Sequence, residues 1–238
     1  MNRLLILLGL LFYTSAQAQT QIFQSGNTKT RLLELYSSQG CSSCPPAERW
    51  VSKQINHPGL WTQFIPLVFH VDYWDYLGWK DPFSNFKYSQ RQRIYQAQHA
   101  VNSVYTPGFI LDGQEWRGLY RGKTLSSSSD SAGILSAELT GENLHVSYQH
   151  AIPLRVNVAL LGFGIQTNIK SGENDGHTFV EDFVVLNHQT LYSENGQWKL
   201  PIPNNSKFNA QRYALAIWIH SGTSLKPLQA AGGWIDLK

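Results

Sequence analysis

Residues 32–46 read LLELYSSQGCSSCPP, and the interpretation of the whole chain depends on this stretch. An apolar run leads into a turn that carries the two cysteines of the protein, Cys41 and Cys44, with two serines between them. Two thiols at this spacing can reach disulfide geometry with little movement of the backbone. The same pair can instead hold a soft metal ion. The sequence alone leaves both uses of the pair open at this point.

Strands and helices alternate around the cysteines. The run at 30–38 is typical of a buried strand, and residues 47–55 have the apolar spacing of a helix. A second buried strand is expected at 64–71. A strand, a helix and a strand in this order form a right-handed unit with parallel strands.

A second helix is expected to follow, because Asp81 and Pro82 are a typical pair for its N-cap and first turn. After this helix, residues 109–111 and a turn at 112–113 predict a hairpin. The outer face of the helix is polar and basic, and we interpret it as solvated; it contains Lys87, Gln90, Arg91 and Arg93.

The composition changes near the middle of the chain. The order of elements predicts a thioredoxin-like α/β domain over residues 19–125, of which residues 19–29 are a polar lead-in. Residues 126–140 begin with consecutive serines, and we expect a linker or weak helix there. Residues 141–238 predict a small antiparallel β-sandwich-like domain, with strands at 144–148, 154–161, 178–186, 197–200, 213–220 and 233–237.

The first residues indicate export. Residues 1–18 have a short basic start, an apolar run too short to span a bilayer, and a small-x-small pattern that ends at Ala18. This is typical of a signal peptide, so the mature protein is expected to be periplasmic or secreted, without a membrane span. The formal net charge is only +3 and no stripe of Lys or Arg occurs, so no nucleic-acid partner is expected.

Three motifs resemble a known family. Residues 34–48 read ELYSSQGCSSCPPAE, residues 69–83 read FHVDYWDYLGWKDPF, and residues 103–107 read SVYTP. Together they resemble a family of exported bacterial thioredoxin-like proteins that is catalogued as a domain of unknown function. The resemblance covers about residues 30–120 and is looser beyond 140, where it implies a β-rich tail. It also implies that Thr106 and Pro107 form the cis-proline bond that faces the active site of thioredoxin-like folds.

The cysteine chemistry can be argued separately. Cys41 lies where a strand leads into a helix, whose N-terminal N–H groups favour a thiolate, so we expect Cys41 to be the exposed, attacking thiol. Cys44 would then resolve the mixed disulfide. Because Pro46 disfavours helical geometry at Pro45, the regular helix is expected to begin only at Pro46.

Neighbouring polar groups could tune this pair. The hydroxyls of Ser42 and Ser43 can donate hydrogen bonds to a sulfur anion. His70 and Asp72 fall near the carboxyl end of the second strand and, two residues apart, point to one face, where either could accept the proton of Cys44. The alternative is that His70 packs in the core and Asp72 caps a turn. Of the two, Asp72 is the favoured catalytic residue.

An aromatic loop and the cis-proline loop are expected at the same edge of the sheet. Together with Thr106, the side chains of Trp74, Tyr76 and Trp79 are candidates for an apolar substrate-binding platform. The alternative is that these aromatic side chains belong to the core.

An acidic segment in the second half is interpreted as a solvated hairpin, because its spacing fits no calcium loop. It contains Glu173, Asp175, His177, Glu181 and Asp182. Neither a metal site nor a cofactor is predicted.

Three functions compete at this stage. The first, which we favour, is an exported thiol–disulfide oxidoreductase that acts on protein thiols and needs a redox-recycling partner. The second is a Cu(I) carrier that uses Cys41 and Cys44 as ligands, with His70 as a candidate for a third. The third is a binding module whose β-rich half docks a partner on a thioredoxin-like scaffold.

Overall fold

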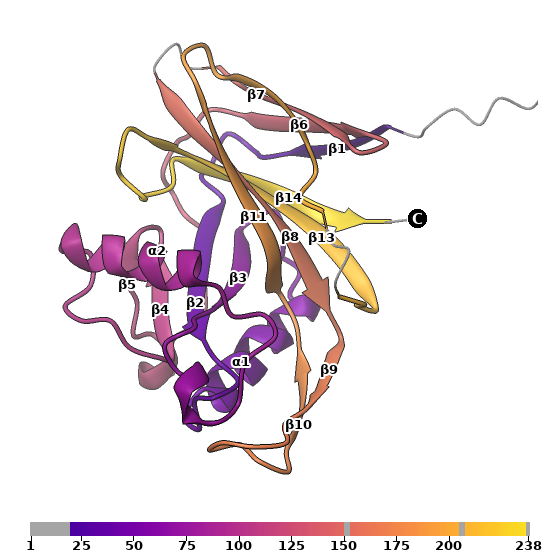
Figure 1. Ribbon diagram of the computed structural model, residues 1–238. Helices are drawn as coiled ribbons and strands as arrows, with labels where there is room; N and C mark the ends of the chain where they lie inside the picture. Colours follow the sequence, from indigo (N-terminus) through magenta and orange to yellow (C-terminus); the bar gives the residue numbers. More distant parts are fainter. Residues whose placement is uncertain (1–19, 150–152, 205–207, 237–238) are drawn as a thin grey trace, which may run out of the picture.

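The structure is a computed structural model, and it describes residues 20–149, 153–204 and 208–236 (Figure 1). The predicted signal peptide at 1–18 lies outside the described residues. The helices are α1 (Pro45–Ser52), α2 (Phe86–Ala97) and the short 3-10 turns η1 (Lys53–Asn56), η2 (Asp75–Leu77) and η3 (Leu119–Arg121). The strands are β1 (Thr20–Gln24), β2 (Arg31–Ser37), β3 (Phe64–His70), β4 (Gly108–Leu111), β5 (Gln114–Glu115), β6 (Leu135–Thr140), β7 (Asn143–Tyr148), β8 (Leu154–Phe163), β9 (Ile165–Asn168), β10 (Thr178–Glu181), β11 (Val184–Ser193), β12 (Gln197–Pro201), β13 (Arg212–Ser221) and β14 (Gln229–Ile235).

These strands form three sheets. The largest has eight strands in the order β14-β13-β8-β11-β3-β2-β4-β5, a second has the order β1-β6-β7-β12, and β9 and β10 form a separate hairpin. No helix in the described part of the chain is long and apolar enough to cross a membrane.

The predicted strand–helix–strand unit lies in the middle of the large sheet. Strand β2 pairs in parallel with β3 and antiparallel with β4, which pairs with β5. Trp50 of α1 contacts Phe109, the residue opposite Leu35, whereas Glu34 binds Arg91 of α2. Because successive residues of a strand point to opposite faces, α1 and α2 cover opposite faces of the sheet.

The large sheet continues across the domain boundary expected at 126–140. Strand β11 pairs in parallel with β3, at Val184 and Val68, and the amide of Val68 donates to the carbonyl of Phe183 at 2.9 Å. All residues of β3 are buried, so its second edge needs a partner strand. The β-rich half therefore supplies strands to the sheet that carries the cysteines, in addition to a sheet of its own.

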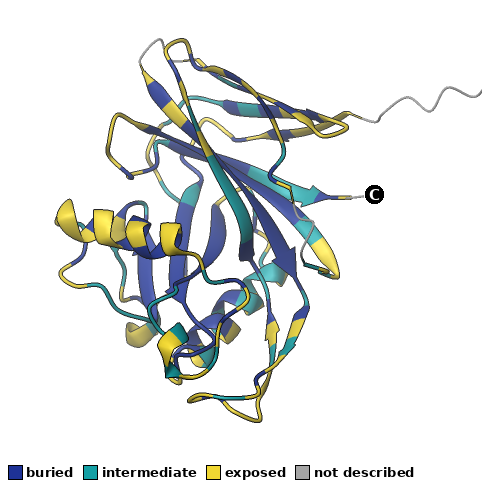
Figure 2. Ribbon diagram, viewed as in Figure 1, coloured by how far each residue is buried: buried dark blue, intermediate teal, exposed yellow. Residues whose placement is uncertain are grey.

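The four-stranded sheet packs against one face of β8, β13 and β14, as the buried strands at the centre of Figure 2 indicate. Strand β8 alternates between two cores. Val156 and Val158 face the four-stranded sheet, whereas Ala159 and Leu161 pack in the core that includes the helices. This double burial explains why almost every residue of β8 is apolar.

Several sequence-based boundaries differ in the structure. Strand β1 lies in the predicted polar lead-in and buries only Phe23, because it is an edge strand. Strand β6 lies within the predicted linker. The strand expected at 178–186 is two strands, β10 and β11, since Phe183 between them has a left-handed backbone with a φ of 58°.

The second helix begins later than predicted. Asn85, not Asp81, caps α2, and its side chain accepts the amide hydrogen of Lys87 at 3.0 Å. The interpretation of Arg91 as a solvated residue is also wrong. Arg91 is buried and donates two hydrogen bonds of 2.8 Å to the carboxylate of Glu34.

A buried histidine makes the stability of this fold sensitive to acid. Burial, with the charges of Arg91 and Arg155, lowers the pKa of His220 to about 4. In the unfolded chain the pKa of this histidine is about 6.5. Between pH 6.5 and pH 4 the unfolded chain therefore binds a proton that the folded chain does not, so the stability of the folded chain falls as the pH falls. From pH 7.5 to 5 we expect this group to cost about 2 kcal/mol. In urea unfolding at both pH values, the loss of stability should be about 2 kcal/mol smaller in His220→Gln than in the wild type; equal losses would contradict this.

Candidate functional site

The two cysteines form a disulfide between the end of β2 and the start of α1, with their Cα atoms 5.5 Å apart. Cys44 is the N-cap residue of α1, and its amide donates to the carbonyl of Cys41 at 3.2 Å. The helix begins at Pro45, one residue before the predicted start. Cys41 therefore lies in the turn that precedes the helix rather than in its first turn.

The proline loop reaches the same edge of the sheet. The peptide bond between Thr106 and Pro107 is cis, as the resemblance implies. Pro107 directly precedes β4, whose first residue, Gly108, is paired with Tyr36 of β2. The cis bond is thereby placed beside the strand that leads to the disulfide.

The predicted exposure of Cys41 is wrong for this disulfide-bonded form. The exposed fraction is 1% for Cys41 and 0% for Cys44. Trp74 packs closely on the turn, because a Cβ atom added to Gly40 would lie 3.1 Å from the Cβ of Trp74. The indole N–H of Trp74 donates to the hydroxyl of Thr106 at 2.7 Å. Trp74 thus joins the cysteine turn to the cis-proline loop.

The loop between β9 and β10 covers the cysteine turn from another direction. The carboxylate of Glu173 accepts the amide hydrogen of Ser42 at 3.1 Å, and the side-chain amide of Asn174 donates to the carbonyl of Gln39 at 2.8 Å. We call residues 169–177 the covering loop. Its contacts join residues more than 130 positions apart, so no local pattern in the sequence predicts them.

The other aromatic candidates differ in exposure. Trp79 is half-buried, and its indole donates to the side-chain oxygen of Gln39 at 2.9 Å. Tyr76 is 77% exposed. Trp74 and Trp79 are thus held by hydrogen bonds, and Tyr76 is the aromatic candidate that presents its ring to solvent.

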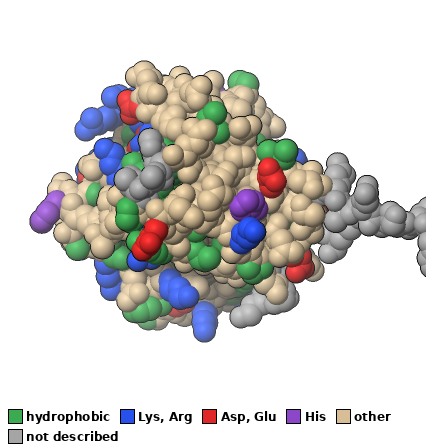
Figure 3. Space-filling view, turned by 90° about the horizontal axis from the view of Figure 1, so that it is seen from above, with side chains coloured by type: hydrophobic (Ala, Val, Ile, Leu, Met, Phe, Trp, Pro, Cys, Tyr) green, Lys and Arg blue, Asp and Glu red, His purple; other side chains and the backbone are tan. Residues whose placement is uncertain are grey.

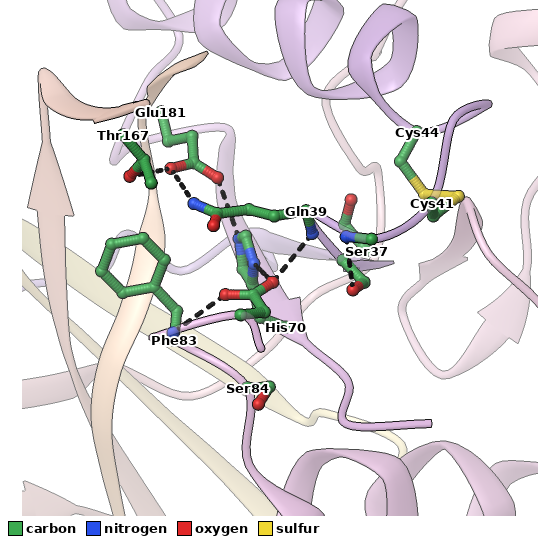
Figure 4. A network of polar contacts seen from close by, with 12 residues as sticks. Ser37, Gln39, Cys41, Cys44, His70, Phe83, Ser84, Thr167 and Glu181 are labelled. Atoms are coloured by element: carbon green, nitrogen blue, oxygen red, sulfur yellow. Dashed lines mark hydrogen bonds and ion pairs between the residues drawn. A yellow bond between two sulfur atoms is a disulfide. The ribbon is translucent and has the colours of Figure 1, made fainter. Parts of the chain in front are cut away.

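The two candidate proton acceptors lie in different surroundings. Asp72 is bound to the hydroxyl of Ser89 in α2, which also accepts the amide hydrogen of Asp72 at 3.1 Å. His70 is fully buried, and its Nδ1 lies 2.7 Å from a carboxylate oxygen of Asp81. It is His70 that the structure places in a buried group of ionisable side chains near the disulfide (Figure 4).

That group includes two glutamates the sequence analysis did not assign to the site. Burial raises the pKa of Glu181 to about 8 and also raises the pKa of Glu48. Burial alone would lower the pKa of His70, but the hydrogen bond and charge of Asp81, with the charges of Glu181 and Glu48, together outweigh burial and raise the pKa of His70 to about 10. The interpretation of Glu181 as part of a solvated hairpin is wrong, since only 2% of it is exposed. Glu48 has a signal in the sequence, because it follows Cys44 by four residues on a helix and so lies on the same face.

One serine between the cysteines lies close to a sulfur. The hydroxyl of Ser43 is 3.4 Å from Sγ of Cys41. In the reduced protein it can donate to the Cys41 thiolate, so Ser43→Ala should raise the pKa of this thiol by about one unit. Ser42→Ala is the matched control. Thiolate absorbance or alkylation rate against pH measures the shift, and equal pKa values for the two variants would contradict this role.

Comparisons with known proteins identify a family and a fold. The family model described as "Protein of unknown function (DUF1223)" matches residues 32–220. A crystal structure of an Agrobacterium tumefaciens protein, solved by a structural genomics consortium, is similar with a TM-score of 0.59 at 22% identity, covering 88% of this chain and 95% of that one. HBP35 of Porphyromonas gingivalis is similar with a TM-score of 0.56 at 13% identity, covering 88% of this chain and 76% of that one. No curated protein matches.

Proposed function

This chain belongs to the DUF1223 family, and we propose that it is an exported thiol–disulfide oxidoreductase with a thioredoxin-like amino-terminal half. The observation that carries the proposal is the position of the Cys41–Cys44 disulfide beside a cis-proline bond. The disulfide lies at the junction of β2 and α1, the cis bond at Pro107 directly precedes β4, and β2 and β4 are paired. In such a site, the cis-proline loop can present its backbone to a peptide that approaches the sulfurs.

The order of the elements supports a thioredoxin-like fold. Strands β3, β2, β4 and β5 are adjacent, with β2 and β3 parallel and β4 reversed. Helices α1 and α2 follow β2 and β3 and cover opposite faces of the sheet. The sequence analysis expects the same succession of strands and helices along the chain for a thioredoxin-like fold.

The exchange takes place in two steps. A client thiolate attacks Sγ of Cys41, a client–Cys41 disulfide forms, and the Cys41–Cys44 bond breaks with release of the Cys44 thiolate. A second client thiolate then attacks the client sulfur and releases Cys41 as a thiolate. Two electrons pass from the client dithiol to the protein, and the two released thiolates take up the two protons lost by the client. The reduced protein runs the same steps in reverse on a client disulfide.

Access to Cys41 requires movement of the covering loop or of Trp74. Two of the contacts that hold the loop to the turn are the hydrogen bonds from Ser42 to Glu173 and from Asn174 to Gln39. Glu173 is exposed, so water competes for its hydrogen bond with the amide of Ser42. Separating the covering loop from the cysteine turn at Glu173 therefore costs little free energy. Once open, the turn offers its backbone groups to a client.

The expected surroundings of the protein follow from its cysteines and amino terminus. A reversible disulfide suits an oxidising compartment, and residues 1–18 have the pattern of a signal peptide, which supports a periplasmic or secreted location. The partners would be client protein thiols and a protein that restores the redox state. On the face shown in Figure 3, basic and acidic side chains are scattered without a basic stripe, which fits protein clients better than nucleic acid.

Equilibration with glutathione tests the proposal. The native protein should convert reversibly between disulfide and dithiol forms in mixtures of reduced and oxidised glutathione, and it should accelerate disulfide exchange in a reduced model protein. Since serines add no positive charge between the cysteines, the potential should lie below the value of about −120 mV of the strongest periplasmic oxidant. A disulfide that resists excess dithiol until the protein is unfolded would contradict the function.

A further inference from the structure

A cluster of ionisable side chains is buried beside the cysteine turn. Glu48 comes from α1, His70 from the end of β3 and Glu181 from β10. One oxygen from each carboxylate and one ring nitrogen of His70 lie within 4.8 Å of one another. Figure 4 shows Glu181 and His70 joined by a dashed line, with the disulfide of Cys41 and Cys44 to the right of them.

Two atoms of this cluster lack a hydrogen-bond partner among the described residues. They are Nε2 of His70 and Oε1 of Glu181, and both are fully shielded from solvent. Buried polar atoms of this kind are rarely left unsatisfied in native proteins. They lie 3.9 Å apart, which is too long for a hydrogen bond. The separation suits a single ion between them, because metal bonds to such atoms are about 2.0–2.2 Å long.

Outer contacts orient each of the three side chains. Asp81 accepts amide hydrogens from Gln39 and Phe83 and lies 2.7 Å from Nδ1 of His70, so Nδ1 is the donor to this carboxylate. Nε2 is the ring atom left for a metal ion, which would displace the proton that Nε2 carries when no metal is bound. Histidines that bind metals are commonly held by a carboxylate in this way. The Nε2 atom of His70, which has no hydrogen-bond partner, is therefore the ring atom that faces Glu181.

The glutamates are oriented similarly. The Oε2 atom of Glu181 accepts from the side chain of Gln39 at 2.7 Å and from Thr167 at 3.3 Å, which leaves Oε1 directed at His70. The hydroxyl of Ser37 donates to Oε1 of Glu48. Each acid therefore has one oxygen tied to the protein.

We propose that Glu48, His70 and Glu181 bind a divalent first-row transition ion of the zinc type. An imidazole with carboxylates suits zinc better than magnesium or calcium, which prefer oxygen alone. Soft Cu(I) is disfavoured, because the two thiols are joined in a disulfide. A divalent cation also offsets the charge of three buried carboxylates, those of Glu48, Asp81 and Glu181, which face one imidazole.

The ion would tie together the parts that surround the disulfide. Glu48 lies one helical turn after Cys44, and Glu181 ends the strand that leads out of the covering loop. Metal binding and disulfide exchange remain separable, since no cysteine is a ligand. A protein that exchanges disulfides but does not retain zinc would contradict the metal site alone, and a protein that retains zinc but does not exchange disulfides would contradict the proposed function alone.

Zinc retention by the oxidised protein tests the site. The full chain, with its disulfide intact, is incubated with Zn²⁺, freed of unbound ion by gel filtration with a weak chelator, and assayed for zinc. We expect about one ion per wild-type chain, and an affinity at least ~10-fold lower in Glu181→Gln and His70→Gln. Glu173→Gln, which removes an exposed acid of the covering loop, is the control and should retain zinc as the wild type does.

A second measurement needs no variant. X-ray absorption of zinc in the oxidised wild type should show imidazole nitrogen and carboxylate oxygen with no sulfur. Wild-type protein that retains no more zinc than His70→Gln overturns the proposal, as does a bound ion with sulfur ligands or with an imidazole-free shell. Equal retention by a folded Glu181→Gln, checked by circular dichroism, also overturns it.

Discussion

Cys44→Ser is expected to trap client proteins on Cys41 as stable mixed disulfides. In this variant the Cys41 thiolate can still attack a client disulfide and form a mixed disulfide, but the thiol that would attack that bond from within the protein is missing. Release then depends on external thiols, so the adducts should persist in non-reducing gels. Catalytic exchange should fall by about 100-fold or more, which is the largest effect on activity that we expect.

The matched variant is Cys41→Ser. It keeps the second cysteine, which is fully buried at the N-cap of α1, and removes the one in the turn. It should trap few or no clients, because we assign the attack to Cys41 and the resolving step to Cys44. If Cys44→Ser traps no protein in cells while it folds normally, or if Cys41→Ser traps as many, the assigned roles of the two cysteines are wrong.

Arg91→Met is expected to lower the free energy of unfolding by about 3–5 kcal/mol. Arg91 and Glu34 form a buried pair with two hydrogen bonds of 2.8 Å, and the hydroxyls of Tyr36 and Tyr95 donate to the same carboxylate at 2.8 and 2.6 Å. Removal of the guanidinium leaves the Glu34 carboxylate buried between β2 and α2 with the two tyrosine hydroxyls but without its positively charged partner. The melting temperature should fall by on the order of 10 °C.

Two further variants separate the charge effect from lost packing. Arg93→Met, on the exposed side of α2, should change stability by less than about 0.5 kcal/mol. The double variant Glu34→Gln with Arg91→Met should recover part of the loss, because no unpaired charge remains. Thermal and urea unfolding measure all three. A double variant less stable than Arg91→Met would contradict the electrostatic explanation.

The sequence predicts the cysteine region well because its signals are local. The apolar run before Cys41, the turn and the helix after Cys44 follow one another within about two dozen residues. The cis bond at Pro107 follows from the motif resemblance. Signals of this kind depend on neighbours in the chain, which a sequence displays directly.

Several predictions are wrong because the residues concerned interact with partners that are distant in the sequence. Arg91 resembles a surface residue of α2 until its partner, Glu34, is known, and 57 positions separate them. Asp81 resembles an N-cap, but its carboxylate is occupied by His70 and by the amide of Gln39. Neither pairing can be inferred from spacing. The burial of Cys41 was missed for a similar reason, since the loop at 169–177 binds the neighbouring residues Gln39 and Ser42.

Strand β6 is a different kind of error, because its signal was present. Leu135, Ala137 and Leu139 are buried and alternate with more exposed residues, yet the serine-rich segment before them suggested a linker. Strand β1 gave no such signal, since an edge strand over a small core needs only one apolar residue, Phe23.

The pairing of β11 with β3 means that the two halves of the chain cannot be separated as modules. A fragment that ends near residue 125 would expose the free edge of β3, a fully buried and entirely apolar strand apart from His70. Such an edge is a template for strand addition between molecules, so the fragment would self-associate instead of folding alone. A chimeric protein that takes its amino-terminal half from a relative would therefore also have to take β11 from that relative.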